Sequence, residues 1–250
     1  IVGILMTMIL SKIGGIFIRL GDIIRLLPTR GLRIFAHLVD GSEKLGKLKP
    51  GAVKAADLSL SIGMWWIELF VLCLDFLGIG ELYEILMDWL KFNTRPLKNW
   101  ERHLAYEIFG NALNYKRVRL DEWAFLGPPQ LRICYVSGYV INSWGKMSNT
   151  TLIHELVHIW QYQNIGLIYI PRALSAQHSK EGYNYGGLER LKQYKKEGKT
   201  IFSFNLEQQA EIISDYYNLK NGYPLQYGKA TYSDLSVYEY FVNQVRETHA

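Results

Sequence analysis

The chain has 250 residues, of which 49% are hydrophobic and 20% are charged, and its formal net charge is +5. This composition excludes an intrinsically disordered chain, because the apolar residues suffice to form a core, and the length suits one large domain or two small ones. The charge excess is mild, and no basic segment carries the interleaved aromatic residues of a nucleic-acid reader. Nucleic acid is therefore not an expected partner.

Residues 1–92 are rich in aliphatic side chains and are expected to form helices. Between Leu10 and Leu27, apolar residues share one helical face and charged residues share the other, which predicts an amphipathic helix with a basic face. Residues 60–77 form a longer apolar segment that approaches the length of a membrane span, and residues 81–90 resume it after two glycines. The sequence therefore predicts a hydrophobic α-helical region over residues 1–92.

Two acidic residues bear on the membrane interpretation of the segment 60–77. Glu68 and Asp75 are seven residues apart, so they lie on the same helical face as Ser61. A face of this kind suits a helix packed against protein better than a helix surrounded by lipid. Two interpretations remain open, namely a helical bundle packed on the rest of the chain and a module that lies on or inserts into a membrane.

The composition changes near residues 93–100, after which tyrosine, asparagine and charged residues become more frequent. Hydrophobic periodicity, glycines and capping residues then predict a mixture of helices and strands. The expected helices cover Asn99–Phe109, a segment that begins after a cap at Asn149 or Thr150, Asn205 to about Lys220, and 233–245 with a cap at Ser233. The expected strands cover 115–120 and 131–141. A second domain of the α+β class is thus predicted over residues 95–250.

The segment LIHELVHIWQYQ, residues 152–163, contains two histidines four residues apart with a glutamate after the first. Residues four apart project to the same side of a helix, so His154 and His158 can offer imidazole nitrogens to one metal ion, for which zinc is well suited. Glu155 projects about 100° away from His154 and can act as the base that takes a proton from water. The flanking residues are apolar, and burying three polar side chains among them is costly unless a metal pairs with them.

A catalytic zinc site needs a third protein ligand. Residues 205–217 place Glu207, Glu211 and Asp215 at successive turns of one helical face, where their like charges repel unless a cation lies nearby. Two assignments fit this pattern. In the first, Glu207 binds zinc and Glu211 orients a ligand histidine, whereas in the second Glu211 binds zinc and Asp215 orients the histidine.

The HELVH motif followed by a distant E-x-x-A-E helix resembles the gluzincin metallopeptidases, especially the compact minigluzincins. In that group the third ligand is the first glutamate of an E-x-x-A-[D/N] segment. The resemblance therefore implies that Glu207 is the ligand and that Glu211, which stands where the pattern has Asp or Asn, orients a histidine. Thermolysin-like enzymes instead have E-x-x-x-D, which would select Glu211 together with Asp215. The minigluzincin pattern is preferred here.

A narrower resemblance covers residues 95 to about 220. These residues look like the zinc peptidase domains associated with bacterial Rhs and Vgr-type secretion and polymorphic toxin proteins. The segments that carry it are RPLKNWERHLAYEIFGNALNYKRVRL, HELVHIWQYQ and EQQAEIISDYY. The resemblance implies a bacterial protein that is exported or delivered as an effector. Its implied partners are a peptide or protein substrate, a secretion-machinery carrier and an immunity protein.

Three residues between the two metal-binding helices are weaker candidates for a catalytic role. His178, Tyr183 and Tyr185 each have a side chain that could donate a hydrogen bond to the oxyanion formed during attack on a carbonyl. Exposed loop residues without such a role are the default interpretation.

Together these patterns predict a compact zincin-like α+β domain with a small sheet, preceded by the hydrophobic helical region. The strand at 131–141 is expected at the sheet edge, where an extended peptide can pair beside the zinc. The expected function is zinc-dependent peptide-bond hydrolysis by a bacterial toxin or effector, with Glu155 as the catalytic residue. Two rivals are a catalytically silent, zinc-stabilised binding domain and a membrane-acting toxin whose active element is residues 1–92.

Overall fold

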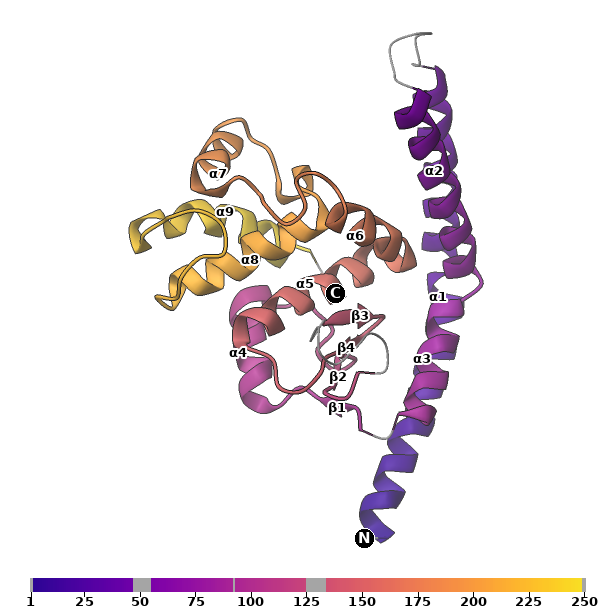
Figure 1. Ribbon diagram of the computed structural model, residues 1–250. Helices are drawn as coiled ribbons and strands as arrows, with labels where there is room; N and C mark the ends of the chain where they lie inside the picture. The colour runs from indigo at the N-terminus through magenta and orange to yellow at the C-terminus, as the bar shows by residue number, and fades with distance from the viewer. Residues whose placement is uncertain (1, 47–54, 92, 125–133, 249–250) are drawn as a thin grey trace. The chain divides into compact units, whose positions relative to one another are not determined.

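The computed structural model describes residues 2–46, 55–91, 93–124 and 134–248, and the chain separates into two compact units (Figure 1). The helical unit comprises Ile1–Phe92 with Gly166–Pro171, and the α+β unit comprises Asn93–Ile165 with Arg172–Ala250. Gly166–Pro171 thus belongs with the helical unit, although the sequence analysis grouped it with residues 95–250. The division into a helical region over residues 1–92 and a domain over residues 95–250 stays a prediction.

The helical unit contains α1 (Val2–Gly46), α2 (Ala55–Phe76) and α3 (Ile79–Leu90). The amphipathic helix predicted for Leu10–Leu27 is part of α1, which continues through Pro28. A proline inside a helix removes one backbone hydrogen bond. Here α1 continues, with Arg19 paired to Glu84 of α3 before that residue and Arg33 paired to Asp75 of α2 after it.

None of the described helices is by itself long and apolar enough to cross a bilayer. The segments Ser61–Phe76 and Ile79–Leu90, bent by 66° at their junction, meet the length and composition criteria together. Gly78 lies at this junction in a left-handed conformation with φ of 73°. A residue with a side chain would be strained there, so glycine permits the bend.

The remaining elements begin after residue 92. The strands are β1 (Arg95–Pro96), β2 (Arg119–Asp121), β3 (Tyr135–Ser137) and β4 (Val140–Asn142). The α-helices are α4 (Asn99–Phe109), α5 (Asn149–Ile165), α6 (Tyr169–Gln177), α7 (Gly187–Lys196), α8 (Leu206–Lys220) and α9 (Leu235–Arg246). The predicted α+β class is confirmed, and α4 has the predicted bounds.

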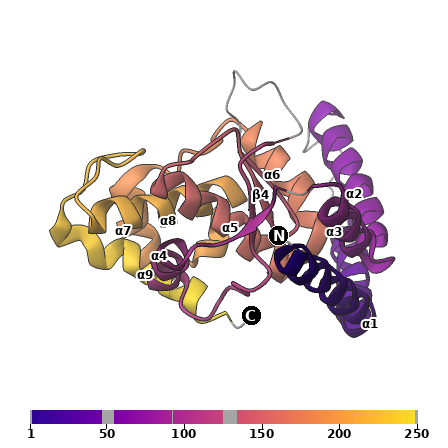
Figure 2. The ribbon, with the colours of Figure 1, turned by 90° about the horizontal axis from the view of Figure 1, so that it is seen from below.

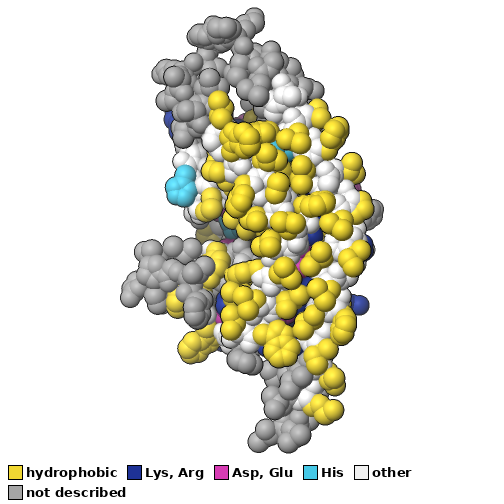
Figure 3. All heavy atoms as spheres, turned by 90° about the vertical axis from the view of Figure 1, so that its right-hand side faces the viewer, with side chains coloured by type: hydrophobic (Ala, Val, Ile, Leu, Met, Phe, Trp, Pro, Cys, Tyr) yellow, Lys and Arg dark blue, Asp and Glu magenta, His cyan; other side chains and the backbone are white. Residues whose placement is uncertain are grey.

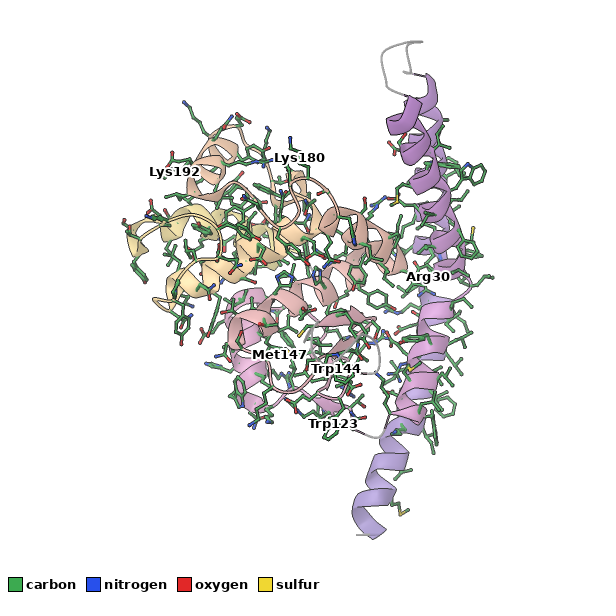
Figure 4. All side chains as sticks on the ribbon, in the orientation of Figure 1. Arg30, Trp123, Trp144, Met147, Lys180 and Lys192 are labelled. Atoms are coloured by element: carbon green, nitrogen blue, oxygen red, sulfur yellow. The ribbon has the colours of Figure 1, made fainter. Side chains whose placement is uncertain are left out.

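The four strands form one mixed sheet with the order β1-β2-β4-β3. β2 pairs with β4 in parallel, whereas β1 with β2 and β3 with β4 pair antiparallel. The single strand predicted for 131–141 is instead the hairpin β3–β4, because Gly138 turns the chain with φ of 62°; residues 131–133 lie outside the described residues. β3 is an edge strand of the sheet. Beyond β2 and β4, Trp123 and Trp144 form an isolated bridge (Figure 4).

The core of the α+β unit surrounds α5, which packs side by side with α8 and also contacts β3 and β4 (Figures 1 and 2). Ile153, Leu156 and Ile159 of α5 are fully buried. The Ser148 hydroxyl accepts a hydrogen bond from the Thr151 amide, so Ser148 caps α5 in place of the predicted Asn149 or Thr150. A buried helix flanked by a sheet and a second helix gives its polar side chains a rigid support.

α9 also begins differently from the prediction. A short 3-10 helix, Tyr232–Asp234, precedes it, and Thr231 forms a reciprocal cap with Asp234. The predicted cap at Ser233 is therefore wrong by two residues, because the chain enters α9 through the tighter 3-10 turn.

Candidate metal centre

The first turn of α5 is attached to the last turns of α8 by side-chain hydrogen bonds. The Asn149 amide donates to the Tyr217 hydroxyl at 3.1 Å, and the Thr150 hydroxyl donates to the Asn218 side-chain oxygen at 2.6 Å. These contacts explain why neither residue serves as the helix cap. They set the register in which the two helices run past each other.

In this register, three of the predicted ligands converge from α5 and α8. The Nε2 atoms of His154 and His158 are 3.2 Å apart, and Oε2 of Glu207 lies 3.4 Å from each of them. Asn205 caps α8 by accepting the Gln208 amide hydrogen at 2.9 Å, which places Glu207 in the first turn. One ligand atom from each of these three residues lies within 4.8 Å of the others, so the group could hold a metal ion.

The opposite ring nitrogens of both histidines have partners of their own. Nδ1 of His154 lies 3.3 Å from a carboxylate oxygen of Glu211, and Nδ1 of His158 lies 2.8 Å from Oε1 of Gln161. Gln161 is in turn held by its amide group, which donates to the Leu206 carbonyl at 2.9 Å. Both partners can accept hydrogen bonds, so they favour a proton on Nδ1, and loss of the Nε2 proton would free the Nε2 lone pairs for a metal ion.

The distances within the cluster suit a small divalent ion. A tetrahedral ion with bonds of about 2.0–2.1 Å keeps its ligand atoms about 3.3–3.4 Å apart, which is close to the observed spacing. Oε2 of Glu207 is buried and has no hydrogen-bond partner in the described structure. It lies 3.4 Å from each imidazole Nε2, and a cation at the centre would contact all three atoms directly.

The electrostatics of the cluster favour positive charge. Burial alone would lower the pKa of His154, but its contacts with Glu207 and Glu211 outweigh this effect and raise the pKa to about 10. Burial would likewise raise the pKa of Glu207, but His154 and His158 lower it to about 2. A protonated His154 thus faces an anionic Glu207, and a cation bound by Nε2 would take the place of that proton.

Glu155 follows His154 on α5 and is 5% exposed. Burial is the main cause that raises its pKa, and the positive field of the two histidines opposes this rise. Oε2 of Glu155 is buried and has no hydrogen-bond partner in the described structure. Glu155 is outside the group whose atoms could hold the metal, so its carboxylate is available for proton transfer.

Tyr183 is one of the weaker candidates, and its ring lies 6.1 Å from the ring of His154, measured between centroids. The Gln177 amide donates a hydrogen bond to the Tyr183 hydroxyl. Burial is the main cause that raises the pKa of Tyr183, so the phenol keeps its proton at neutral pH. Tyr183 therefore has a proton to donate beside the cluster.

The other candidates are engaged elsewhere. His178 is exposed, and its Nδ1 pairs with the Leu174 carbonyl at 2.8 Å. The Tyr185 hydroxyl is buried and donates to Asp215 at 2.6 Å. Asp215 also accepts the Gln226 amide hydrogen at 2.7 Å, and burial raises its pKa although these hydrogen bonds oppose the rise. Tyr185 is therefore not placed at an oxyanion, and Asp215 does not contact a ligand histidine. Instead, the two side chains bond to each other and to the backbone of residues 226 and 227.

Sequence reasoning missed Gln161. Its position three residues after His158 places it one helical turn away on a neighbouring face, which is a usable signal for a residue that orients a histidine ring. The sequence could not show that the Gln161 amide is held by the Leu206 carbonyl, because these two residues are 45 positions apart in the chain.

Comparison with known proteins finds a similarity to the type VI secretion system spike protein VgrG2b of Pseudomonas aeruginosa. The two sequences are 28% identical over 153 residues, which cover 55% of this chain and 14% of the spike protein. The chain thus corresponds to a small part of that relative, and the similarity links it to Vgr-type secretion proteins. No family model and no solved structure matches the chain.

Proposed function

We propose that the chain is a zinc-dependent peptidase of the gluzincin type, with His154, His158 and Glu207 as the metal ligands. The observation that carries this proposal is the convergence of two Nε2 atoms and one carboxylate oxygen at spacings of 3.2 to 3.4 Å. Two imidazole nitrogens and one carboxylate oxygen form a donor set that suits zinc. When bound, zinc supplies Lewis acidity, which makes water a stronger nucleophile near neutral pH and polarises a carbonyl group.

Glu155 is the residue proposed to move protons. In peptide hydrolysis, a water oxygen bonds to the carbonyl carbon and loses a proton, and the C–N bond then breaks as the leaving nitrogen gains one. The Glu155 carboxylate takes the first proton and delivers it to the nitrogen. Its buried, unpaired Oε2 is free to accept the proton, and its raised pKa makes it a stronger base.

Tyr183 is proposed to stabilise the carbonyl oxygen as negative charge develops on it. Gln177 donates to the Tyr183 hydroxyl oxygen, so the phenolic proton remains available for a hydrogen bond to that oxygen. Glu211 and Gln161 keep the two ligand histidines in orientation through their Nδ1 atoms.

The sheet edge provides a place for the substrate. β3 is an edge strand, and the sheet packs on α5 through β3 and β4. An extended peptide can pair with an edge strand through main-chain hydrogen bonds, which align a peptide bond without strict sequence selectivity. A peptide or protein is therefore the proposed substrate.

The biological role proposed here is that of a bacterial effector. The similarity to a type VI secretion spike protein supports an association with Vgr-type secretion machinery. An immunity protein that protects the producing cell is proposed as a further partner. Delivery and toxicity together give a direct cellular test of the zinc chemistry.

The test compares wild type with Glu155→Gln, because glutamine keeps the shape of the side chain and removes the proton acceptor. Both proteins are expressed at matched abundance in a susceptible bacterium, in the cytoplasm and in the periplasm. Both are also incubated with a peptide library in the presence of zinc. We expect equal zinc content and similar melting temperatures, with cleavage and toxicity reduced by about 10² to 10⁴ in the variant.

The outcomes separate the rivals. If both proteins kill equally, catalysis at this site is not the source of toxicity, and residues 1–92 become the active element. If the wild type binds zinc yet cleaves no peptide and kills no cell, the zinc serves a silent binding domain. If the wild type takes up no stoichiometric metal, the assignment of the centre fails.

A further inference from the structure

The helical unit has its polarity reversed relative to a soluble helical bundle. Its exposed large hydrophobic side chains run along all three helices, for example Phe17, Phe35, Phe70 and Leu86 at 71%, 65%, 64% and 54% exposure. Figure 3 shows hydrophobic side chains gathered over most of the visible face of these helices. Soluble monomeric proteins rarely expose a contiguous apolar surface of this extent.

The charged side chains of this unit are instead directed between the helices. Arg30 of α1 is 3% exposed and forms ion pairs with Asp75 at 3.6 Å and with Glu81 (Figure 4). Arg19 of α1 pairs with Glu84 of α3 at 3.0 Å. Charged groups are rarely buried in a small soluble bundle when apolar side chains are available to fill the same positions.

These pairs form a ladder between α1 and the two helices that pack on it. From one end to the other, the α1 residues are His37, Arg33, Arg30, Arg19 and Lys12, and their respective partners are Glu68, Asp75, Glu81 with Asp75, Glu84 with Asp88, and the Asp88 carbonyl. From Lys12 to His37 the ladder rises by 25 residue steps, or about 38 Å, which exceeds the hydrocarbon thickness of about 30 Å of a bilayer.

Within residues 61–90, α2 and α3 carry no exposed charged side chain. Throughout residues 61–90, all of which the structure describes, each acidic residue is buried or half-buried and faces α1. On α1 between residues 12 and 42, only Arg25 and Asp40 are exposed charged residues, and Arg25 is hydrogen-bonded to Asp22 at 2.9 Å. Paired charges inside and apolar side chains outside are what hydrocarbon requires, since lipid tails offer no hydrogen-bond partners.

Two further features suit a lipid environment. Exposed Trp66 and Trp89 lie near the two ends of the bent α2–α3 pair, and tryptophan is enriched where helices meet the membrane interface. Gly41 lies against the indole of Trp65, so that a side chain at Gly41 would displace the ring, and small residues of this kind allow close helix packing in membranes. A docking surface for one protein would instead carry a polar rim around its apolar centre.

We propose that the helical unit is embedded in a lipid bilayer, with the outer faces of α1, α2 and α3 against acyl chains and the ion-pair ladder facing inward. This proposal does not depend on the peptidase activity. It favours the membrane module over the bundle packed on the rest of the chain. Glu68 and Asp75, which argued against lipid contact, are paired with His37 and Arg33 of α1.

The test uses the full chain, synthesised in a cell-free reaction with vesicles of pure phosphatidylcholine. Neutral lipid removes electrostatic attraction of a basic protein, and a high-salt wash removes what remains. After flotation through a density gradient, we expect the wild type to float with the vesicles. The matched variants are Phe70→Asp in α2 and Phe202→Asp in the α+β unit, since these phenylalanines are 64% and 61% exposed.

Phe70→Asp should lower the ratio of bound to free protein about tenfold or more, because a carboxylate is strongly disfavoured in hydrocarbon. Phe202→Asp should leave the ratio unchanged. The proposal is overturned if folded wild type stays at the bottom of the gradient or if the two variants float alike. It is also wrong if, without vesicles, the wild type forms a dimer that Phe70→Asp dissociates, because the face is then an interface between two copies.

A second measurement covers the case in which Phe70→Asp does not fold. Brominated phosphatidylcholine quenches tryptophan fluorescence on contact, and the Trp66→Phe/Trp89→Phe double variant should lose most of the quenching. Trp123→Phe in the α+β unit serves as the control, since Trp123 is 77% exposed. If the double variant and the control lose the same fraction of quenching, the apolar face does not contact lipid.

Discussion

The two units bury charged residues in different ways. In the helical unit, the carboxylates of Asp75 and Glu81 face the guanidinium group of Arg30, so the protein itself supplies the opposite charge. In the α+β unit, the carboxylate of Glu207 faces two imidazoles, and its Oε2 has no hydrogen-bond partner among the described residues. Both arrangements contain buried polar atoms without a hydrogen-bond partner among the described residues, namely Arg30 Nε and Nη1 with Glu81 Oε2 in the first and Glu207 Oε2 in the second. The first pairs carboxylates with a guanidinium group, whereas the second brings together donor atoms that a metal ion can bind.

The two units also differ in where their apolar side chains lie. Leu72, Ile168 and Tyr169 are the large hydrophobic side chains buried in the described part of the helical unit, whereas the α+β unit buries many along α5, α8 and α9. A hydrophobic core explains the stability of the α+β unit in water. Apolar composition alone therefore does not identify a core, because the same residue types face outward in the helical unit.

The largest expected effect concerns zinc affinity at the candidate metal centre of the α+β unit. Glu207→Gln should weaken zinc affinity by more than about 100-fold, because a ligand is lost, whereas Glu211→Gln should weaken it by about 10- to 100-fold, since it orients His154. His154→Ala should abolish stoichiometric binding. Competition titration with a chromogenic chelator measures all three variants. The reverse order of Glu207→Gln and Glu211→Gln would move the ligand to Glu211.

The ion pairs that Arg30 forms with Asp75 and Glu81 in the helical unit are tested by Arg30→Ala. This change leaves Asp75 and Glu81 buried without their shared cation and should lower the free energy of unfolding by about 3–5 kcal/mol. Arg25→Ala is the control, because Arg25 is 72% exposed and its pair with Asp22 should contribute less than about 1 kcal/mol. Hydrogen exchange of α1 and α3 amides reports the local change. Equal protection in the two variants would contradict the ladder as a stabilising feature.

A carboxylate–arginine pair at the start of α4 allows a test by pH within the α+β unit. Burial alone would raise the pKa of Glu101, but hydrogen bonds from Arg95 at 2.7 and 2.9 Å and from the Lys98 amide lower it. A lowered folded-state pKa means that the pair stabilises the fold above the unfolded value of about 4.3 and that this stability is lost as pH falls through the folded value.

Glu101→Gln should therefore lower the free energy of unfolding by about 1–3 kcal/mol at neutral pH, a range that allows for the partly exposed Arg95. The difference from wild type should shrink as the pH falls below about 4. Urea unfolding of both proteins across this pH range measures it. A difference that stays constant with pH would show that the effect is one of packing and not of charge.

The smallest expected effect concerns two hydrogen bonds at the start of α5, the local helix cap of Ser148 and the tertiary contact of Thr150 with Asn218. Ser148→Ala removes the cap and should cost about 1 kcal/mol of stability with little change in zinc affinity. Thr150→Ala keeps the cap but removes the 2.6 Å hydrogen bond to Asn218, so it should cost a similar amount and also weaken zinc binding by shifting α5 against α8. Denaturant unfolding and chelator competition measure the two quantities. Identical zinc affinities would show that these bonds do not set the register.

Much of the local structure near the site could be predicted from the sequence. The periodicity and the terminal glycine define α4 as Asn99–Phe109, and Asn205 begins α8 as a helix cap. The hairpin β3–β4 was missed, because Tyr135–Ser137 and Val140–Asn142 have similar composition and only Gly138 separates them as a turn. The length of α1 was also missed, since Pro28 is tolerated through packing that lies far away in the sequence.

The sequence by itself determined which chemical groups are available and which helical face they share. His154 and His158 project to one side because they are four residues apart, and Glu155 projects elsewhere because it is adjacent to His154. Glu207 and Glu211 share one face of α8 for the same reason, so periodicity could not choose between them. The tertiary structure places Glu207 opposite both Nε2 atoms and Glu211 opposite Nδ1 of His154. Sliding α8 by one turn, about 5.4 Å, would exchange the two glutamates, and only the packing of α5 on α8 decides that register.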